Sequence, residues 1–184
     1  PTPFQRILGG RRSIRRFLPT PVEPEKLRAC LEAARIAPSA HNAQPWRFIV
    51  VDDPALKDLV AAGAFAGIYG GSRFAAKAPV LLILLAKRQF VAHHLGGRFQ
   101  RVPYYFLDIG IAGEHIVLQA EELGLATCWM GWFSRGRVRR ALKIPRKFKI
   151  AAMMPIGYAE KRPTREPPRK TLEEIVAFNR VPPD

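Results

Sequence analysis

The residues best suited to chemistry lie near the beginning of the chain, where arginines surround a hydroxyl group. Residues 11–17 read Arg-Arg-Ser-Ile-Arg-Arg-Phe. A phosphate monoester carries nearly two negative charges near neutral pH and offers several acceptor oxygens, which suit guanidinium groups and a serine hydroxyl. The segment therefore indicates phosphate binding. Its spacing alone also fits a basic N-terminal arm.

A second segment of interest occupies residues 37–48 and reads Ala-Pro-Ser-Ala-His-Asn-Ala-Gln-Pro-Trp-Arg-Phe. Two prolines fix an irregular loop here, and small residues allow its backbone to approach a flat ligand. The amide side chains of Asn42 and Gln44 can donate to and accept from the edge of a heteroaromatic ring. An ordinary capped turn is the alternative interpretation. For Trp46 we expect a place in the core.

The net charge of +15 makes the chain attractive to anions. Its densest basic stretch, residues 135–149, contains no acid, and a helix there would have an apolar stripe of Val138, Ala141 and Leu142. A solvated helix face explains this stretch better than a nucleic-acid patch, so nucleic-acid binding is kept only as an alternative. Residues 59–107 also contain no Asp or Glu and should attract anions.

The elements that position these segments follow from hydrophobic spacing and turn residues. Helical spacing predicts helices over residues 24–37, 55–62, 104–123 and 135–143, and the capping pair Thr171 and Glu174 predicts a short terminal helix. Apolar runs predict strands over residues 47–51, 79–86 and 148–158, with 126–132 extended. Residues 63–77 are expected to be a loop or loosely helical, and 88–103 a lid. Separated strands without regular βαβ spacing favour an α+β fold.

Length and composition set further limits. A chain of 184 residues that is 48% hydrophobic can bury one sizeable core, so we expect one domain over residues 1–184. The longest apolar run, 79–86, is far shorter than the roughly 20 residues that cross a bilayer. No secretory signal is recognised in residues 1–10, and a cytoplasmic location is the expectation. Cys30 and Cys128 lie in apolar segments and are expected to be buried thiols without a disulfide.

The basic segment, residues 11–17, and the proline-containing segment, residues 37–48, together carry a family resemblance. The chain resembles the FMN-dependent nitroreductase family, whose members begin with Arg-Arg-Ser-x-Arg-x-Phe and continue, one helix later, with Ala-Pro-Ser-x-x-Asn-x-Gln-Pro-Trp. Further matches follow in order at residues 108–112, 120–125, 129–131, 155–158 and 168–176. The resemblance implies a central mixed or antiparallel sheet flanked by helices, with the long helix over 104–123 buried at a dimer interface.

The resemblance also implies roles for the matching positions. The FMN phosphate and ribityl chain would be held by Arg11, Arg12, Ser13 and Arg15, and from the C-terminal side by Arg169. The flavin would be reached from the other subunit by Pro38, Ser39, Ala40 and Asn42. Backbone groups near the reactive edge of the flavin would come from Trp129, Met130 and Gly131. No side chain is expected to act as a catalytic acid or base.

The implied activity is that of a homodimeric FMN-dependent oxidoreductase with its FMN sites at the subunit interface. NAD(P)H would deliver hydride to flavin N5, and a nitroaromatic, quinone or similar planar acceptor would then replace it in a ping-pong cycle. A flavoenzyme of the same fold with another donor or chemistry is the alternative: a dehydrogenase, a flavin-consuming enzyme or a deazaflavin-linked reductase. Residues 63–77 lack the Asn that the family often supplies to the flavin, which leaves Arg73 or Lys77 for that contact.

The histidines do not indicate a metal site. His93 and His94 are adjacent, so their side chains point in different directions in any regular element, and we expect aromatic lid residues there. His115 falls within the long helical pattern, where a hydrogen-bonded structural role is expected.

Overall fold

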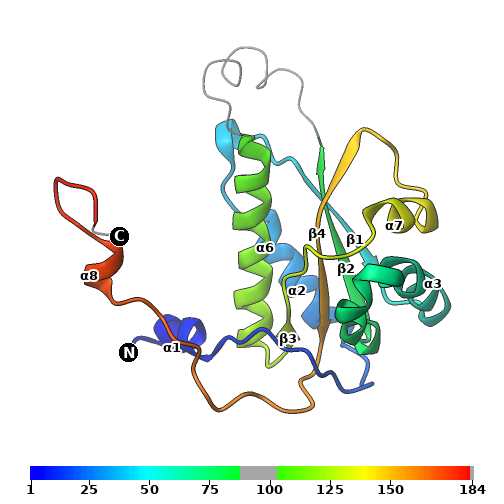
Figure 1. The fold of residues 1–184 in the computed structure, drawn as a ribbon, viewed down its shortest axis with the longest axis horizontal. Coiled ribbons are helices and arrows are strands. Elements are labelled where there is room, and N and C mark those ends of the chain that lie inside the picture. The colour runs from blue at the N-terminus through cyan, green and yellow to red at the C-terminus, as the bar shows by residue number, and fades with distance from the viewer. Residues whose placement is uncertain (88–102, 183–184) are drawn as a thin grey trace.

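The fold is built around a four-stranded antiparallel sheet, in a computed structural model that describes residues 1–87 and 103–182. The strands lie in the order β1-β2-β4-β3, with bounds β1 (Trp46–Val51), β2 (Val80–Lys87), β3 (Ala126–Thr127) and β4 (Phe148–Gly157). Helices cover both faces of this sheet (Figure 1). The predicted α+β class, with an antiparallel sheet flanked by helices, is confirmed.

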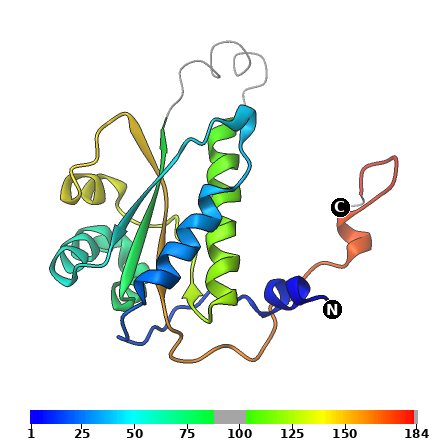
Figure 2. The same ribbon diagram turned by 180° about the vertical axis from the view of Figure 1, so that it is seen from behind.

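The helices form one layer on each side of the sheet. The described helical segments are α1 (Pro3–Gly10), α2 (Pro24–Arg35), η1 (Ala40–Asn42), α3 (Pro54–Ala64), η2 (Gly67–Lys77), α6 (Tyr104–Glu122), α7 (Arg135–Ala141) and α8 (Leu172–Ile175). α2 and α6 pack on one face and share its hydrophobic core, whereas α3, η2 and α7 cover the other (Figure 2). The predicted helices 24–37, 55–62 and 135–143 correspond to α2, α3 and α7.

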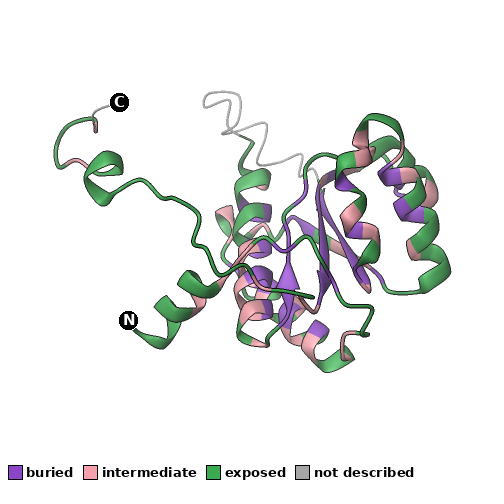
Figure 3. Ribbon diagram, turned by 60° about the horizontal axis from the view of Figure 1, so that its bottom comes forward, coloured by how far each residue is buried: buried purple, intermediate pink, exposed green. Residues whose placement is uncertain are grey.

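Strand β2 explains the continuous apolar run of the sequence. Side chains alternate between the faces of a strand, and here both faces are buried. Its even-numbered residues join the core beneath α2 and α6, and Leu81, Ile83 and Leu85 join the core beneath α3 and α7. Figure 3 shows the buried sheet between helices whose outer sides are exposed.

Strand β3 is shorter than the extended stretch predicted over residues 126–132. Ala126 pairs with Gly157 and Thr127 with Ile156, and pairing with β4 resumes only at Met130 and Met153. The same register would place Cys128 opposite Pro155, which has no amide hydrogen to donate. The ladder is therefore interrupted at Cys128, and the chain reaches Trp129 outside a regular strand.

Helix α6 is buried on one side and exposed on the other. Ile109, Ala112 and Ile116 face the sheet, whereas Leu107 is 54% and Ile111 39% exposed. The expectation of a buried helix is thus met on the sheet side, whereas the described part of the chain leaves the opposite side partly exposed. The structural role expected of His115 is confirmed, because its Nδ1 forms a hydrogen bond of 3.0 Å with the carbonyl of Ala33.

Helix α1 was not predicted from the sequence. Thr2 and Gln5 form a capping box at its start, and Pro3 occupies the first turn, but no residue of the helix is buried. Its apolar side chains do not pack into the core of the chain, so the hydrophobic pattern gave no reason to predict a helix here. α1 and α8 both lie outside the layers that enclose the sheet (Figures 1 and 2).

Two predicted core features hold. Trp46 is only 6% exposed, and both thiols are buried and free. Burial raises the pKa of Cys30 to about 11. Among the described helices, none is long and apolar enough to span a bilayer.

Candidate functional site: an arginine-lined cleft

A cleft of about 570 Å³ separates the N-terminal segment from the segment that follows β4. Its charged and hydroxyl lining comes from both segments: Arg11, Arg12, Ser13, Arg15, Arg165, Glu166 and Arg169. Five of these side chains are arginines and one is a carboxylate, so the cleft is strongly cationic. The structure thus brings Arg169 to the four N-terminal residues predicted to share a site with it.

The N-terminal wall is fixed by two buried apolar residues, Ile14 and Phe17. Ile14 and Phe17 are 2% and 6% exposed and pack in a small core with Ala78 and Ala126. The amide of Ile14 donates to the carbonyl of Thr127 at 3.0 Å, which joins the segment to the outer side of β3. These two apolar side chains anchor the segment, and Arg11, Arg12 and Arg15 line the cleft beside them.

The C-terminal wall is fixed by Arg162. Its Nη1 contacts both carboxylate oxygens of Glu121 at 2.6 and 2.8 Å, and its Nη2 donates to the carbonyl of Leu125 at 3.0 Å. A two-pronged contact of this kind sets the orientation of the chain as well as adding energy. It holds residues 163–169 beside the end of α6 and opposite the N-terminal wall.

Arg12 provides the test of whether the cleft suits an anion. Its side chain is 15% exposed, its Nη1 donates to the carbonyls of Gly9 and Arg11, and its Nη2 lies 3.5 Å from Glu166. Its Nε is buried and has no hydrogen-bond partner in the described part of the chain. An unpartnered buried donor is costly, and an anionic oxygen would satisfy it. The residues present therefore fit a phosphate group.

The positive field reaches beyond the cleft to the end of β3. Burial raises the pKa of the Cys128 thiol, and Arg15 and Arg11 oppose that rise because their charges favour the thiolate. Both guanidinium groups therefore act electrostatically on the residue that precedes Trp129. An anion in the cleft and a group beside Trp129 would lie within one electrostatic environment.

Trp129, Met130 and Gly131 present mainly backbone groups. The indole Nε1 of Trp129 donates to Glu114 at 3.1 Å, and its ring lies over Gly113 of α6. The amide of Met130 is already bonded to the carbonyl of Met153 at 2.9 Å. The amide of Gly131 has no partner within the described part of the chain. Gly131 is therefore a backbone donor that this strand end can offer to a ligand.

The loop with Pro38, Ser39, Ala40 and Asn42 lies elsewhere. The amide of Ala40 donates to Asp108 at 3.0 Å, near the beginning of α6. The arginine cleft adjoins the end of the same helix, and 14 residues at about 1.5 Å each separate Asp108 from Glu122 by about 21 Å. One chain therefore does not bring this loop to its own cleft. Figure 1 shows the loop, in cyan, at the opposite end of α6 from the N-terminal segment.

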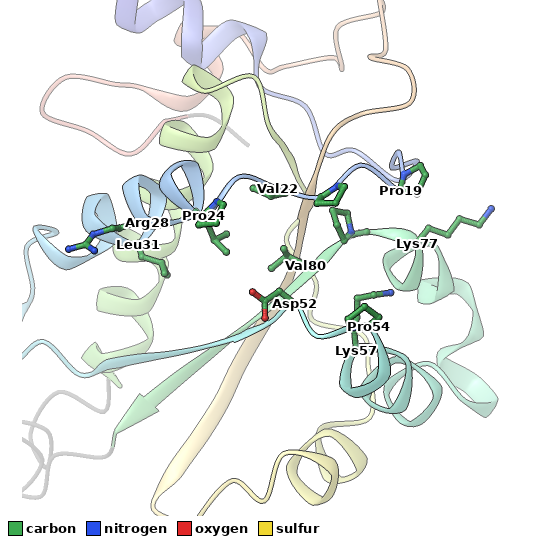
Figure 4. Close-up of a pocket in the computed structure, with 14 residues that line it drawn as sticks. Pro19, Val22, Pro24, Arg28, Leu31, Asp52, Pro54, Lys57, Lys77 and Val80 are labelled. Atoms are coloured by element: carbon green, nitrogen blue, oxygen red, sulfur yellow. The ribbon is translucent and has the colours of Figure 1, made fainter.

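The other residues predicted to contact the flavin or the substrate lie on other surfaces or outside the described residues. Lys77 lines a separate cavity of about 580 Å³, with Pro19, Asp52 and Lys57, rather than the arginine cleft (Figure 4). Arg73 is exposed and lines neither of these two spaces. Of the predicted lid at 88–103, all but Pro103 lies outside the described residues, including His93 and His94. No cluster of three metal-ligating side chains occurs among the described residues.

Sequence reasoning missed several contributors to this region. Arg165 and Glu166 line the cleft, and their signal was available in the proline- and arginine-rich run that leads to Arg169. Glu114 and Asp108 hold Trp129 and the Ala40 loop by hydrogen bonds between distant segments. Nothing in their spacing pointed to those partners.

Comparison with known proteins finds a matching family model, similar sequences and similar solved structures. The family model described as "Nitroreductase family" matches residues 8–70 and 68–158. A protein of Thermus thermophilus named "NADH dehydrogenase" is 34% identical over 174 residues, which cover 80% of this chain and 82% of that protein. The structure of an FMN-dependent nitroreductase from Clostridium difficile R20291 superposes with a TM-score of 0.78 at 29% identity, over 95% of this chain and 98% of the other. A nitroreductase family protein from Clostridium novyi NT gives a TM-score of 0.76 at 31% identity, over 89% and 88%.

Proposed function

The chain belongs to the nitroreductase family of oxidoreductases, and we propose that it is an FMN-dependent NAD(P)H oxidoreductase that works as a homodimer. The observation that carries the proposal is the cleft in which five arginines converge and the Nε of Arg12 is left for an anion. The names of the relatives support it, since one is an NADH dehydrogenase and another an FMN-dependent nitroreductase.

The cleft would hold the phosphate of FMN. The guanidinium groups of Arg11, Arg15 and Arg169 would donate to its oxygens, Arg12 would add its unpartnered Nε, and Ser13 would add a hydroxyl. Glu166 is largely exposed and can turn away, because its side chain is 80% accessible. Net attraction therefore remains after its charge is counted.

The reactive ring would lie toward Trp129, Met130 and Gly131. FMN held there would supply the chemistry of hydride and electron transfer between NAD(P)H and a nitroaromatic, quinone or similar planar acceptor. The amide of Gly131 would donate to a flavin edge, and a fixed donor of this kind stabilises negative charge without reorganisation. We assign no acid or base to a side chain, because the protein's part is to bind, orient and exclude water.

The second subunit would complete the site. Pro38, Ser39, Ala40 and Asn42 lie about 21 Å along α6 from the arginine cleft of their own chain. In a symmetric dimer the same loop can face the partner's cleft, and each pair of chains then holds two equivalent sites. NAD(P)H and the acceptor would occupy the open face of each flavin in turn.

The first experiment measures binding of FMN and of riboflavin to the apoprotein by quenching of flavin fluorescence. Arg11→Gln and Arg15→Gln should each weaken FMN binding by about 10- to 100-fold, since hydrogen bonds to charged groups contribute about 1.5–3 kcal/mol. Riboflavin binding should hardly change, because it has no phosphate. Arg137→Gln, an exposed arginine on α7, is the matched control and should leave both affinities unchanged.

The second experiment tests the electron donor. The purified protein should be yellow, and anaerobic NADH or NADPH should bleach the bound flavin. A colourless protein that does not take up added FMN would contradict the proposal. Bound FMN that neither nicotinamide reduces would instead favour a flavoenzyme of this family with another donor.

A further inference from the structure

Asp108 is unusual because it is a buried carboxylate without a basic partner among the residues that the structure describes. The polar side chains that are buried in the described part of the chain are Ser72, Asp108 and Thr127, and Asp108 is the ionisable one of these. It is 4% exposed, and no salt bridge to it occurs among the described residues. A buried carboxylate is tolerated only where hydrogen bonds compensate for lost water.

The compensation comes from the backbone of a distant loop. Asp108 Oδ1 accepts the amide hydrogen of Ala40 at 3.0 Å, across 68 positions of sequence. Within the loop, Ser39 Oγ accepts from the amide of Gln44 at 2.9 Å, and Asn42 Oδ1 accepts from Gln44 Nε2 at 2.9 Å. The Asp108 contact therefore joins helix α6 to a loop that is also held by hydrogen bonds between its own residues.

The loop needs such a tie because its backbone is strained. His41, Asn42 and Gln44 have φ values of 51°, 51° and 43°, in the left-handed region that side chains other than glycine rarely adopt. Strain of this kind persists only where surrounding contacts fix the conformation. Without the carboxylate, the segment Ser39–Gln44 would relax toward ordinary backbone angles.

We propose that Asp108 is a positioning residue for the flavin site of the partner subunit. This inference rests on the proposed function, in which Ser39, Ala40 and Asn42 reach the partner's flavin. Asp108 touches no substrate; it holds the loop, through the amide of Ala40, in the one shape that presents those residues. Its effect is therefore exerted in trans, on the cleft formed by the other chain's Arg11 and Arg15.

The single variants separate the hydrogen bond from the charge. Asp108→Asn keeps an oxygen acceptor for Ala40 and should bind FMN within about threefold of the wild type, whereas Asp108→Leu should bind at least tenfold more weakly. Ala40→Pro removes the donor from the other side, at a first helical position that suits proline. It should reproduce the loss if the Leu variant does not fold. Hydrogen exchange should rise in residues 39–44 of both disabling variants.

Mixed dimers decide whether the effect is in trans. Differently tagged chains are co-expressed, one with Asp108→Leu and the other with Arg11→Gln and Arg15→Gln, and dimers with both tags are isolated. If Asp108 serves the partner's site, one cleft has both intact arginines and an intact loop. The mixed dimer should then bind one FMN with wild-type affinity, although neither parental homodimer does.

The outcomes keep this inference apart from the proposed function. A mixed dimer without a wild-type site would show that Asp108 acts on its own chain's cleft and would overturn the inference. An Asp108→Leu homodimer that binds FMN like the wild type would also overturn it. Failure of the unmodified protein to bind FMN would instead contradict the proposed function itself.

Discussion

Gly113 lies beneath the indole of Trp129, and the contact leaves no room for a side chain. A Cβ at this position would lie 2.2 Å from Cη2 and 2.5 Å from Cζ2 of Trp129, and 3.0 Å from Leu84. The indole is also held by its hydrogen bond to Glu114. A single methyl group on α6 must therefore displace a residue of the candidate flavin site.

We predict that Gly113→Ala destabilises the protein and moves Trp129. Overpacking of this kind lowers the free energy of unfolding by about 1–3 kcal/mol, more than the roughly 1 kcal/mol that alanine gains in helix propensity. Denaturant unfolding would measure the first effect, and near-ultraviolet circular dichroism the second. Gly136→Ala in α7 is the control, because its Cβ would meet no atom within 4 Å. An unaltered spectrum for Gly113→Ala would show that the indole stays in place and would contradict the prediction.

The sequence was sufficient to predict residues whose chemistry follows from the type of their side chain. The arginines around Ser13 indicated phosphate binding by their type, although their spacing also fitted a basic arm, and the family pattern added Arg169 to them. Contacts such as Gly113 with Trp129 could not be predicted, since neither spacing nor composition relates a helix glycine to a tryptophan beyond the next strand. Arg12 combines the two cases. Its side-chain type indicated an anion site, but the missing partner of its Nε depends on packing and could not be predicted.

At the scale of elements, a polar triad joins the beginning of α2 to the end of β4. Lys26 Nζ donates to Glu23 Oε1 at 3.2 Å and to the hydroxyl of Tyr158 at 2.6 Å, and that hydroxyl donates to Glu23 Oε2 at 2.5 Å. The hydrogen bond from Tyr158, aided by Glu23's own backbone and by Lys26, lowers the pKa of Glu23 from 4.5 to about 2. Bonding to Tyr158 and Glu23 raises the pKa of Lys26.

We predict that this triad contributes to acid resistance. A carboxyl whose pKa is lower in the folded state stabilises the fold above its unfolded pKa of 4.5, and that contribution is lost as the pH falls toward about 2. Glu23→Gln should therefore flatten the dependence of the thermal midpoint on pH between these limits, and Tyr158→Phe should flatten it partly. Glu25→Gln, an exposed carboxyl in the same turn, is the control. A wild-type slope retained in Glu23→Gln would contradict the role of the triad.

Helices and strands were predictable where the side chains of a whole face or stripe are buried. β2 was recognised because both of its faces are buried, and α2 and α7 because each buries one stripe. α1 buries nothing within the chain, so only its capping box of Thr2 and Gln5 could have indicated it. The sequence predicted residues 126–132 only as extended. The end of regular pairing after Thr127 could not be predicted, because Pro155 interrupts the ladder only by falling opposite Cys128.

At the scale of the whole molecule, apolar residues are left uncovered on one side. Leu107 and Ile111 lie one turn apart on the side of α6 away from the sheet, and Phe4 of α1 is 57% exposed. In the C-terminal segment, Ile175 is 55% and Phe178 is 88% exposed. These side chains are the apolar surface that the proposed dimer would cover. A second copy of the chain would cover it and would also supply the loop that each cleft lacks.

We predict that Leu107→Glu uncouples the subunits and empties the flavin sites together. A carboxylate forced into an apolar interface is costly, and the dimer should weaken by more than about 100-fold. Sedimentation velocity should then show the 20.7 kDa chain rather than a pair of chains. FMN affinity should fall in the same concentration range, because Ser39 and Asn42 of the partner leave the site. Leu59→Glu on α3 is the matched control, since Leu59 is 59% exposed on the opposite layer. A Leu107→Glu monomer that binds FMN as tightly as the wild type would place the whole site within one chain.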